Sequence, residues 1–110
     1  MHAVTAGGNT IGQYFTPRWV TALMAKMAHV KLEDKVLDPC SGTGGFLIAA
    51  AQEALQNAQE KDVKFKWEDA IDKMKDNLYG FESESVTAAL CVVNMVRRLS
   101  CVGLRVCYRS

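Results

Sequence analysis

The segment from Lys35 to Ala51 constrains the fold of this chain more than any other. A short apolar run ends in Asp38, the loop Ser41–Gly45 contains three glycines, and the apolar run Phe46–Ala51 follows directly. The simplest interpretation is a strand, a glycine loop and a helix. Such a unit suits a parallel sheet, in which a helix returns the chain to the start of the next strand.

A second unit of the same kind lies downstream. Residues 78–82 (Leu-Tyr-Gly-Phe-Glu) predict a strand that ends in Glu82, and residues 84–98 predict a helix. The expected apolar face of that helix consists of Val86, Ala89, Leu90 and Val93. Residues 102–108 fit either a strand or a frayed tail. Two strands, each followed by a helix, predict an α/β fold with parallel strands and right-handed crossovers.

Two more helices are expected outside these units. At about 17–29, Thr16 can cap the helix and Pro17 suits its first turn. Its apolar residues at helical spacing are Val20, Leu23, Met24 and Met27. The charge-rich stretch near 62–77 predicts a solvated helix with one apolar stripe. That stripe contains Trp67, Ile71 and Met74. We expect Met24, Met27, Met74 and Met95 in the core, Trp67 to pack, and His29 at a helix end.

Composition excludes several classes of protein. A length of 110 residues has room for one domain, and 49% hydrophobic with 23% charged residues indicates a globular core. Thirteen Lys and Arg against twelve Asp and Glu argue against a polybasic nucleic-acid module. No apolar run reaches the roughly 20 residues that span a bilayer, and the N-terminus lacks signal-peptide features. We therefore expect no membrane association and a cytoplasmic location.

The last quarter of the chain differs from the rest. No Asp or Glu follows Glu84, whereas four of the five arginines and three of the four cysteines come after residue 90. The cysteines form no CxxC pair, so we expect reduced thiols and no metal site. Solvation or disorder is the better interpretation of the basic tail, although arginines can also contact phosphate backbones.

The predicted loop has the features of a ligand site. Ligands of parallel sheets collect at the carboxyl ends of the strands. The glycines let the backbone of the loop approach a ligand closely, and the following helix offers free N–H groups. Asp38 would repel a phosphate and attract an amino group, so a zwitterionic ligand fits better than a nucleoside triphosphate. The missing Gly-Lys-Ser/Thr ending also argues against a P-loop.

Glu82 lies 82 − 38 = 44 residues beyond Asp38, at the end of the next predicted strand. A carboxylate there can accept hydrogen bonds from both hydroxyls of a ribose. Together, Asp38 and Glu82 predict a ligand with an amino acid at one end and a nucleoside at the other.

Three stretches now resemble a known family. They are Gly12-Gln13-Tyr14-Phe15-Thr16-Pro17-Arg18, then Asp38-Pro39-Cys40-Ser41-Gly42-Thr43-Gly44-Gly45-Phe46-Leu47, then Leu78-Tyr79-Gly80-Phe81-Glu82 with Thr87 and Asn94-Met95. They resemble the adenine-N6 DNA methyltransferases, specifically the modification subunit of type I restriction–modification systems. The resemblance implies a truncated Rossmann-like S-adenosylmethionine-dependent methyltransferase fold, with two to three parallel strands and flanking helices. It also implies S-adenosyl-L-methionine as cofactor.

The family's cofactor-binding residues carry over position by position. Gln13, Tyr14, Phe15, Thr16, Pro17 and Arg18 match the N-terminal motif, which packs beside the methionine end of the cofactor. Asp38 with Ser41, Gly42, Thr43, Gly44 and Gly45 matches the main cofactor motif, and Glu82 matches the acid on the ribose. The expected organisation is a flexible lead at 1–10, a cofactor-binding part at 11–95 and a divergent basic tail at 96–110.

The catalytic motif of the family does not carry over. That motif is Asn/Asp-Pro-Pro-aromatic, which holds a flipped-out adenine, but the only prolines here are Pro17 and Pro39. We therefore assign no catalytic residue and expect no methyl transfer by this sequence alone. After Met95 the family's Leu/Ile-His-Gly is replaced by Val96-Arg97-Arg98-Leu99. These departures suggest a truncated or frame-disrupted product, or a piece of a longer subunit.

The resemblance also implies partners: DNA, through the intact subunit, and the specificity and restriction subunits of a type I system. A noncatalytic structural or interaction remnant is the alternative function, and self-association would cover the edges of so small a sheet. A methyltransferase acting on protein or a small molecule is a third and weaker hypothesis, because the stretch Gly12–Arg18 is characteristic of the DNA enzymes.

Overall fold

The chain folds as an α/β unit. The computed structural model describes residues 16–99 and the backbone of residues 105–108, so the expected lead at 1–10 lies outside the described residues. The helices are α1 (Arg18–Ala28), α2 (Gly45–Lys61), α3 (Trp67–Met74) and α4 (Ser85–Leu99). The strands are β1 (Val36–Asp38), β2 (Leu78–Glu82) and β3 (Arg105–Tyr108), and a 3-10 turn at Lys75–Asn77 precedes β2.

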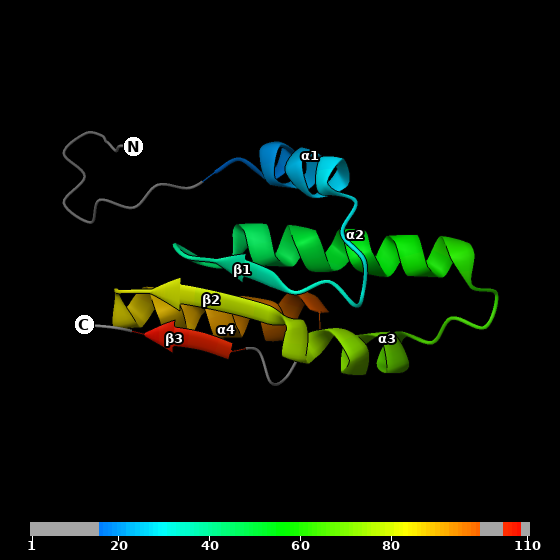
Figure 1. The fold of residues 1–110 in the computed structure, drawn as a ribbon. Coiled ribbons are helices and arrows are strands. Elements are labelled where there is room, and N and C mark those ends of the chain that lie inside the picture. The colour runs from blue at the N-terminus through cyan, green and yellow to red at the C-terminus, as the bar shows by residue number, and fades with distance from the viewer. Residues whose placement is uncertain (1–15, 100–104, 109–110) are drawn as a thin grey trace.

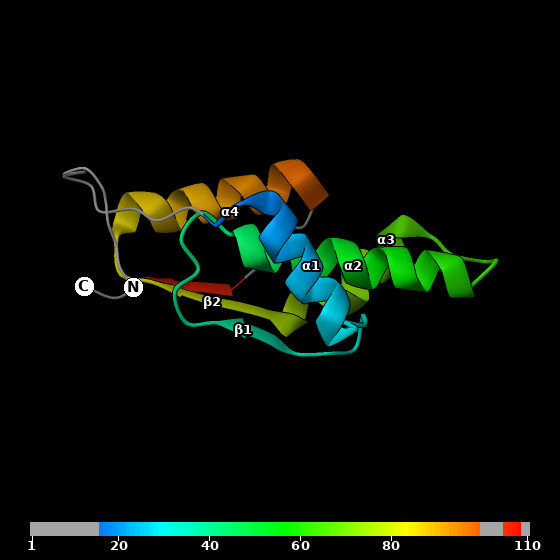
Figure 2. The same ribbon diagram turned by 90° about the horizontal axis from the view of Figure 1, so that it is seen from above.

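The three strands form one parallel sheet in the order β1-β2-β3. Asp38 lies opposite Gly80, and Glu82 lies opposite Tyr108, so the carboxyl ends of the strands meet at one edge. The prediction of an α/β fold with parallel strands is confirmed, and residues 105–108 of the undecided segment are a strand. Figures 1 and 2 show α2 and α4 on one face of the sheet, and no described helix covers the other face.

The core lies between the sheet and the two helices behind it. Its largest fully buried side chains are Leu47, Met74, Leu78, Cys91, Met95 and Leu99. The prediction that Met74 and Met95 belong to the core is therefore confirmed. Alternating burial along β2, with Leu78 and Gly80 buried and Phe81 exposed, matches a strand that has helices on one face only.

The predicted apolar face of α4 is wrong. Val86, Ala89, Leu90 and Val93 are all exposed. The buried face instead holds Thr87, Ala88, Cys91, Met95 and Leu99. Apolar residues surround most of this helix, so spacing alone could not select its inner face. On the buried face Met95 and Leu99 fill the core, while Cys91 contacts the glycine loop at Gly44.

The first helix also differs from its prediction. Leu23, Met24 and Met27 are exposed, whereas Thr21 and Ala25 are buried against α2. Thr16 does not cap α1, because Pro17 occupies the position before the helix and no side chain caps it. The end of α1 was predicted correctly. His29 follows the helix in a left-handed conformation, with φ of 54°.

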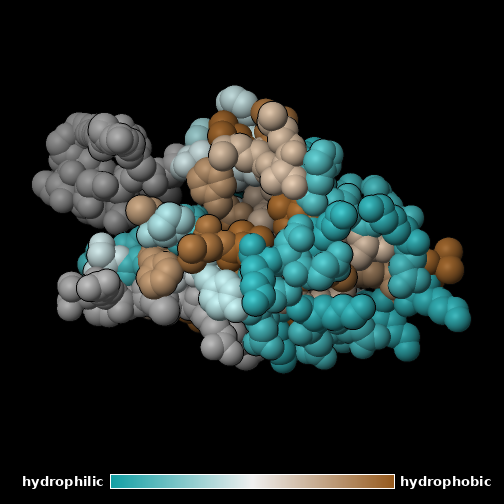
Figure 3. Space-filling view, viewed as in Figure 1, coloured by the Kyte–Doolittle hydropathy of each residue, from teal (hydrophilic) through white to brown (hydrophobic). Residues whose placement is uncertain are grey.

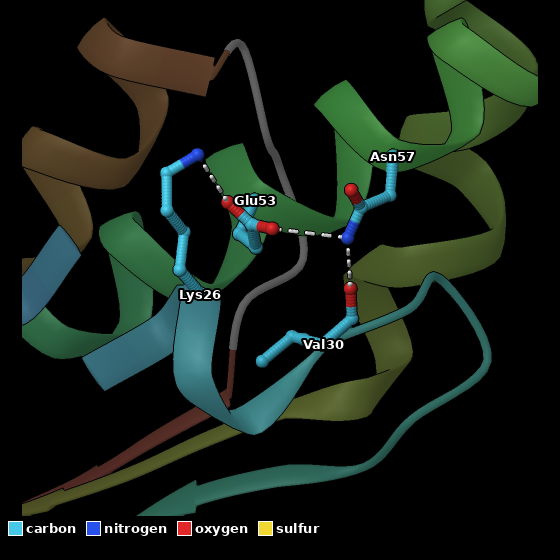
Figure 4. Close-up of polar contacts among 4 residues, drawn as sticks. All are labelled: Lys26, Val30, Glu53 and Asn57. Atoms are coloured by element: carbon cyan, nitrogen blue, oxygen red, sulfur yellow. Dashed lines mark hydrogen bonds and ion pairs between the residues drawn. The ribbon is translucent and has the colours of Figure 1, made fainter. Parts of the chain in front are cut away.

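Polar contacts fix the end of α1 to α2 (Figure 4). The amide nitrogen of Asn57 donates to the carbonyl of Val30 over 3.2 Å and to Oε2 of Glu53 over 3.1 Å. Lys26 Nζ lies 3.8 Å from Oε1 of the same glutamate. These contacts lie far from the carboxyl ends of the strands, so they stabilise the scaffold and leave the glycine loop untouched.

The charged helix α3 lies beside α2, is shorter than the helix expected near 62–77, and buries two of the three residues of its predicted stripe, since Trp67 is 42% exposed. Ile71 and Met74 are buried, and Trp67 packs edge-on against Phe65 with ring centroids 6.5 Å apart. In Figure 3 hydrophilic residues gather over α3 and the adjoining end of α2, whereas hydrophobic ones gather over α1. No helix within residues 16–99 is long and apolar enough to cross a membrane.

Candidate functional site

The glycine loop joins β1 to α2 at the carboxyl edge of the sheet. Gly42 and Gly44 have φ of 55° and 95°, conformations that residues with a Cβ rarely adopt. The N–H of Ser41 donates to the carbonyl of Phe81 over 2.8 Å, and the N–H of Gly44 donates to the carbonyl of Ser41 over 2.9 Å. The loop is therefore tied to β2 as well as folded on itself.

Two glycines allow other residues to approach this loop closely. A Cβ on Gly80 would lie 2.9 Å from Cβ of Ser41 and 3.0 Å from Cδ1 of Leu47. A Cβ on Gly44 would lie 3.0 Å from Sγ of Cys91 on α4. The loop is thus packed against both β2 and α4, with no room for a methyl group at either contact.

Asp38 and Ser41 each have a buried oxygen atom without a hydrogen-bond partner among the described residues. Oδ1 of Asp38 accepts a hydrogen bond from the N–H of Cys40 over 3.0 Å, whereas Oδ2 is buried and unpaired. The hydroxyl of Ser41 is also buried and has no hydrogen bond of good geometry within the described residues. Buried polar atoms are rarely left unpaired, because each costs free energy. Both atoms can serve a ligand that lies at the end of β1.

Glu82 connects the glycine loop to the start of α4. Its Oε1 accepts a hydrogen bond from the N–H of Gly42 over 3.1 Å, and its Oε2 accepts one from the N–H of Glu84 over 2.9 Å. Glu84 in turn caps α4, since its Oε1 accepts from the N–H groups of Val86 and Thr87. Each carboxylate oxygen can accept two hydrogen bonds, so Glu82 keeps capacity for a further donor at each oxygen.

Helix α4 contacts the loop from the other side. The amide nitrogen of Asn94 donates to the carbonyl of Thr43 over 3.1 Å. Cys91, one turn earlier, is fully buried. Burial raises the pKa of its thiol above 9.0, the nearby hydroxyl of Ser41 opposes that rise, and the charges of Asp38 and Glu82 add to it. Cys91 is therefore a neutral thiol at pH 7.

Neither Asp38 nor Glu82 forms an ion pair with a cationic side chain of the described residues. The ion pairs within residues 16–99 join Lys26 to Glu53 and Lys75 to Asp72, and neither involves Asp38 or Glu82. No group of three or more His, Cys, Asp or Glu side chains in the described part of the chain could hold a metal ion. A cationic organic group is thus the partner that the charges favour.

A pocket of about 90 Å³ lies between the start of α1 and the glycine loop. Its lining includes Thr16, Thr21, Ser41, Gly42 and Phe46. A neighbouring pocket of about 170 Å³ is lined by Thr16, Arg18 and Arg98, among others. Chain folding therefore brings the start of α1 to the loop, although Thr16 and Ser41 are 25 residues apart in sequence (41 − 16 = 25).

Most of the predicted site residues converge on this edge of the sheet. Thr16 lines both pockets and Arg18 the second, while Pro17 joins them at the start of α1. Asp38, Ser41, Gly42, Thr43, Gly44, Gly45 and Glu82 lie in or against the loop. Gln13, Tyr14 and Phe15 lie outside the described residues.

A larger pocket, of about 410 Å³, lies beside α3 and includes none of the predicted site residues.

Four residues of this region were missed as functional candidates. Gly80, Glu84, Cys91 and Asn94 contact the loop or fix the elements that do. Asn94 had a signal in the sequence, since it is the one amide within an apolar run of α4. Glu84 had a weaker one, because an acid before an apolar run is compatible with a helix start. Nothing local marks Gly80 or Cys91.

Comparisons with known proteins agree with this arrangement. The sequence matches the N-6 DNA Methylase family over residues 1–100. It is 36% identical over 91 residues to the type II restriction enzyme and methyltransferase RM.BcgI of Heyndrickxia coagulans. It is 33% identical over 91 residues to the type I restriction enzyme EcoEI methylase subunit of Escherichia coli. Each match covers 83% of this chain.

A solved structure shares the fold. It is the crystal structure of a modification subunit ascribed to a type I restriction enzyme of Vibrio vulnificus YJ016, with a TM-score of 0.69, 27% identity and 94% of this chain covered. The chain spans only 13% and 17% of the lengths of the two relatives and 20% of that structure. The family match covers far more than half of the chain, and the protein therefore belongs to the N-6 DNA methylase family.

Proposed function

We propose that this chain forms the S-adenosyl-L-methionine-binding part of an adenine-N6 DNA methyltransferase of type I restriction–modification systems, with a Rossmann-like methyltransferase fold. In this proposal residues 11–95 form the cofactor-binding part, and the basic segment 96–110, which includes the end of α4 and the strand β3, lies outside it. DNA and the specificity and restriction subunits are partners of the intact subunit. A cytoplasmic location is part of the proposal, because the protein must reach DNA.

The observation that carries the proposal is the pair of unpaired buried oxygens beside the glycine loop. Oδ2 of Asp38 and Oγ of Ser41 offer an acceptor and a hydroxyl where a ligand would meet the end of β1. A Cβ on Gly44 would crowd Cys91 and one on Gly80 would crowd Ser41, so these glycines let the loop lie close to α4 and β2. A ligand with an amino group would pair with the carboxylate and offset the cost of burying it.

The residues present fit S-adenosyl-L-methionine, which supplies an activated methyl group when bound. Asp38 and Ser41 would hold its amino acid end, and Thr16, Pro17 and Arg18 would lie beside that end. Gln13, Tyr14 and Phe15 belong to the same proposed motif. Negative charge at Asp38 and Glu82 favours the cationic sulfonium and ammonium groups of this molecule.

Glu82 would hold the ribose through the acceptor capacity left on its two oxygens. The loop residues Gly42, Thr43, Gly44 and Gly45 would contribute backbone contacts. We propose no methyl transfer by these 110 residues alone, because the Asn/Asp-Pro-Pro-aromatic motif is absent from the sequence. The base pocket would belong to the remainder of a longer protein.

Calorimetric titration with S-adenosyl-L-methionine and with its demethylated product tests the proposal. We expect both ligands to bind, and we expect Asp38→Asn to weaken binding by about tenfold or more, since it removes the charge and keeps the shape. Asp76→Asn is the matched control, because Asp76 is exposed and lies on the turn before β2. Absence of binding by folded wild-type protein contradicts the proposal.

The variant Glu82→Gln tests the second acid. It keeps one oxygen acceptor and removes the charge, so we expect weaker binding with a fold close to that of the wild type. Glu60→Gln on the exposed end of α2 is its control. Equal affinity of Glu82→Gln and Glu60→Gln would remove Glu82 from the site and leave the Asp38 assignment standing.

A noncatalytic interaction part is the second candidate function. The exposed apolar side chains of α1 and α4, together with the uncovered sheet face, favour it. Exposed residues of this kind include Trp19, Met27, Leu37 and Val86. Large exposed apolar patches mark surfaces that other protein covers. Self-association in sedimentation experiments, without binding of S-adenosyl-L-methionine, would favour this candidate over the first.

A further inference from the structure

We infer that Asn94 is a positioning residue, which holds the glycine loop in its binding conformation from the side of α4. The inference rests on the proposed function for its consequence in ligand binding. The hydrogen bond from Asn94 to the loop itself does not depend on any ligand. The amide nitrogen of Asn94 donates to the carbonyl of Thr43, 51 residues earlier in the chain, over 3.1 Å.

Thr43 lies between the two glycines that have positive φ. Within the loop the N–H of Gly44 donates to the carbonyl of Ser41. The carbonyl of Thr43 is not part of that turn, so a partner from elsewhere in the fold must satisfy it. The carbonyl of the peptide that joins Thr43 to Gly44 accepts its hydrogen bond from Asn94, which lies outside the loop. Rotation of that peptide would break both the bond from Asn94 to the carbonyl of Thr43 and the bond from the N–H of Gly44 to the carbonyl of Ser41, and would change the shape of the loop.

The second strand–helix unit holds the loop at two points, the N–H of Gly42 and the carbonyl of Thr43. Glu82, at the end of β2, accepts from the N–H of Gly42. Asn94, on α4, donates to the carbonyl of Thr43. The start of α4 is itself fixed by Glu82, through the N–H of Glu84. Loop, strand and helix therefore form a connected set of hydrogen bonds, to which Asn94 contributes from within the helix.

Packing on α4 supports this role. Cys91 lies one turn before Asn94, and its Sγ leaves only 3.0 Å to a Cβ placed on Gly44. Asn94 is half-buried and Cys91 is fully buried. The face of α4 that touches the loop is thus held in place, and the amide of Asn94 is carried on a rigid element rather than on a mobile one. Asn94 lines neither pocket beside the loop, so it would act through Thr43 rather than by touching the ligand.

Amide hydrogen exchange of the full 110-residue chain tests the inference without a ligand. Asn94→Asp keeps the shape of the side chain and removes the donor, and Asn94→Ala removes both. We expect the amides of residues 41–45 to exchange roughly threefold or more faster in both variants, with exchange inside α2 unchanged. Asn57→Ala is the matched control, because Asn57 also donates to a backbone carbonyl but lies far from the loop.

Binding of S-adenosyl-L-methionine supplies the second measurement. A residue that acts through the loop should weaken the binding of the cofactor and of its demethylated product by the same factor, roughly three- to tenfold. Asn94→Gln keeps the amide donor and should retain part of the affinity that the other two variants lose. Failure of the wild type to bind would contradict the proposed function alone, since loop exchange still decides the role of Asn94. Unchanged loop exchange in folded Asn94→Asp overturns the inference.

Discussion

Oε1 of Glu82 accepts a hydrogen bond of 3.1 Å from the backbone N–H of Gly42, a residue 40 positions earlier. The same carboxylate holds the N–H of Glu84 at the start of α4 through its other oxygen. One side chain therefore joins the loop after β1, the end of β2 and the start of a helix. A residue proposed to bind ribose is also a structural link, and its two roles can be separated by substitution.

Glu82→Ala should lower the free energy of unfolding by about 2 kcal/mol, because two backbone donors lose a charged acceptor. Glu82→Gln should lose about half as much, since it keeps one oxygen acceptor. Urea unfolding followed by circular dichroism measures both. Glu60→Ala, an exposed change on α2, gives the baseline. If Glu82→Ala unfolds at the same urea concentration as Glu60→Ala, the link through Glu82 adds nothing to stability.

Glycine substitutions should separate crowding from backbone strain. Gly80→Ala places a methyl group 2.9 Å from Cβ of Ser41, so we expect a loss of about 1–3 kcal/mol from overpacking. Gly42 has open space around it but φ of 55°, so Gly42→Ala should cost about 1 kcal/mol through conformation alone. Gly42→Asn should cost less, because asparagine tolerates the left-handed region. Thermal melts of the three variants check this order, and an equal cost for Gly42→Asn and Gly42→Ala would exclude strain as the cause.

Most elements of the fold could be predicted from the sequence because they have local signals, whereas β3 could not, since residues 102–108 fit a strand or a frayed tail equally well. The glycine loop, the two acids at strand ends and the order of strands and helices all follow from short patterns. The links through Glu82 and Asn94 could not be predicted, because their partners are backbone atoms 40 and 51 residues away. Their positions are set by the register of the sheet and by the way α4 packs on it.

Buried faces were the least predictable feature. On α1 the apolar stripe that includes Leu23 and Met27 is exposed, and the small residues Thr21 and Ala25 face α2. Small side chains allow two helices to lie close together, whereas hydrophobic periodicity only finds where apolar residues recur. Resemblance to a family supplied the predicted residues of the candidate site but carried no information about which helix face is buried in this chain.

Cys91 should make stability depend on pH in the alkaline range. Burial raises the pKa of its thiol above 9.0, so the unfolded chain loses the proton first as the pH rises. The unfolded state then binds fewer protons than the native state, and the free energy of unfolding falls as pH increases through and above 9. Melting temperatures from pH 7.5 to 10 measure this fall. Cys91→Ala should show a shallower decline than the wild type, and parallel declines would exclude Cys91 as its source.

Truncating a side chain on the buried face of α4 should lower the free energy of unfolding much more than truncating one on its exposed face. Met95 is fully buried, so Met95→Ala should lower the free energy of unfolding by about 2–5 kcal/mol, through lost burial and a cavity. Leu90 is 46% exposed, and Leu90→Ala should change it by about 0.5 kcal/mol or less. Urea unfolding at a concentration where the protein is monomeric measures both. A larger loss for Leu90→Ala than for Met95→Ala would mean that the face expected from periodicity is the buried one after all. The expected result, a larger loss for Met95→Ala than for Leu90→Ala, would leave Leu90 and its exposed neighbours free to pack against other protein.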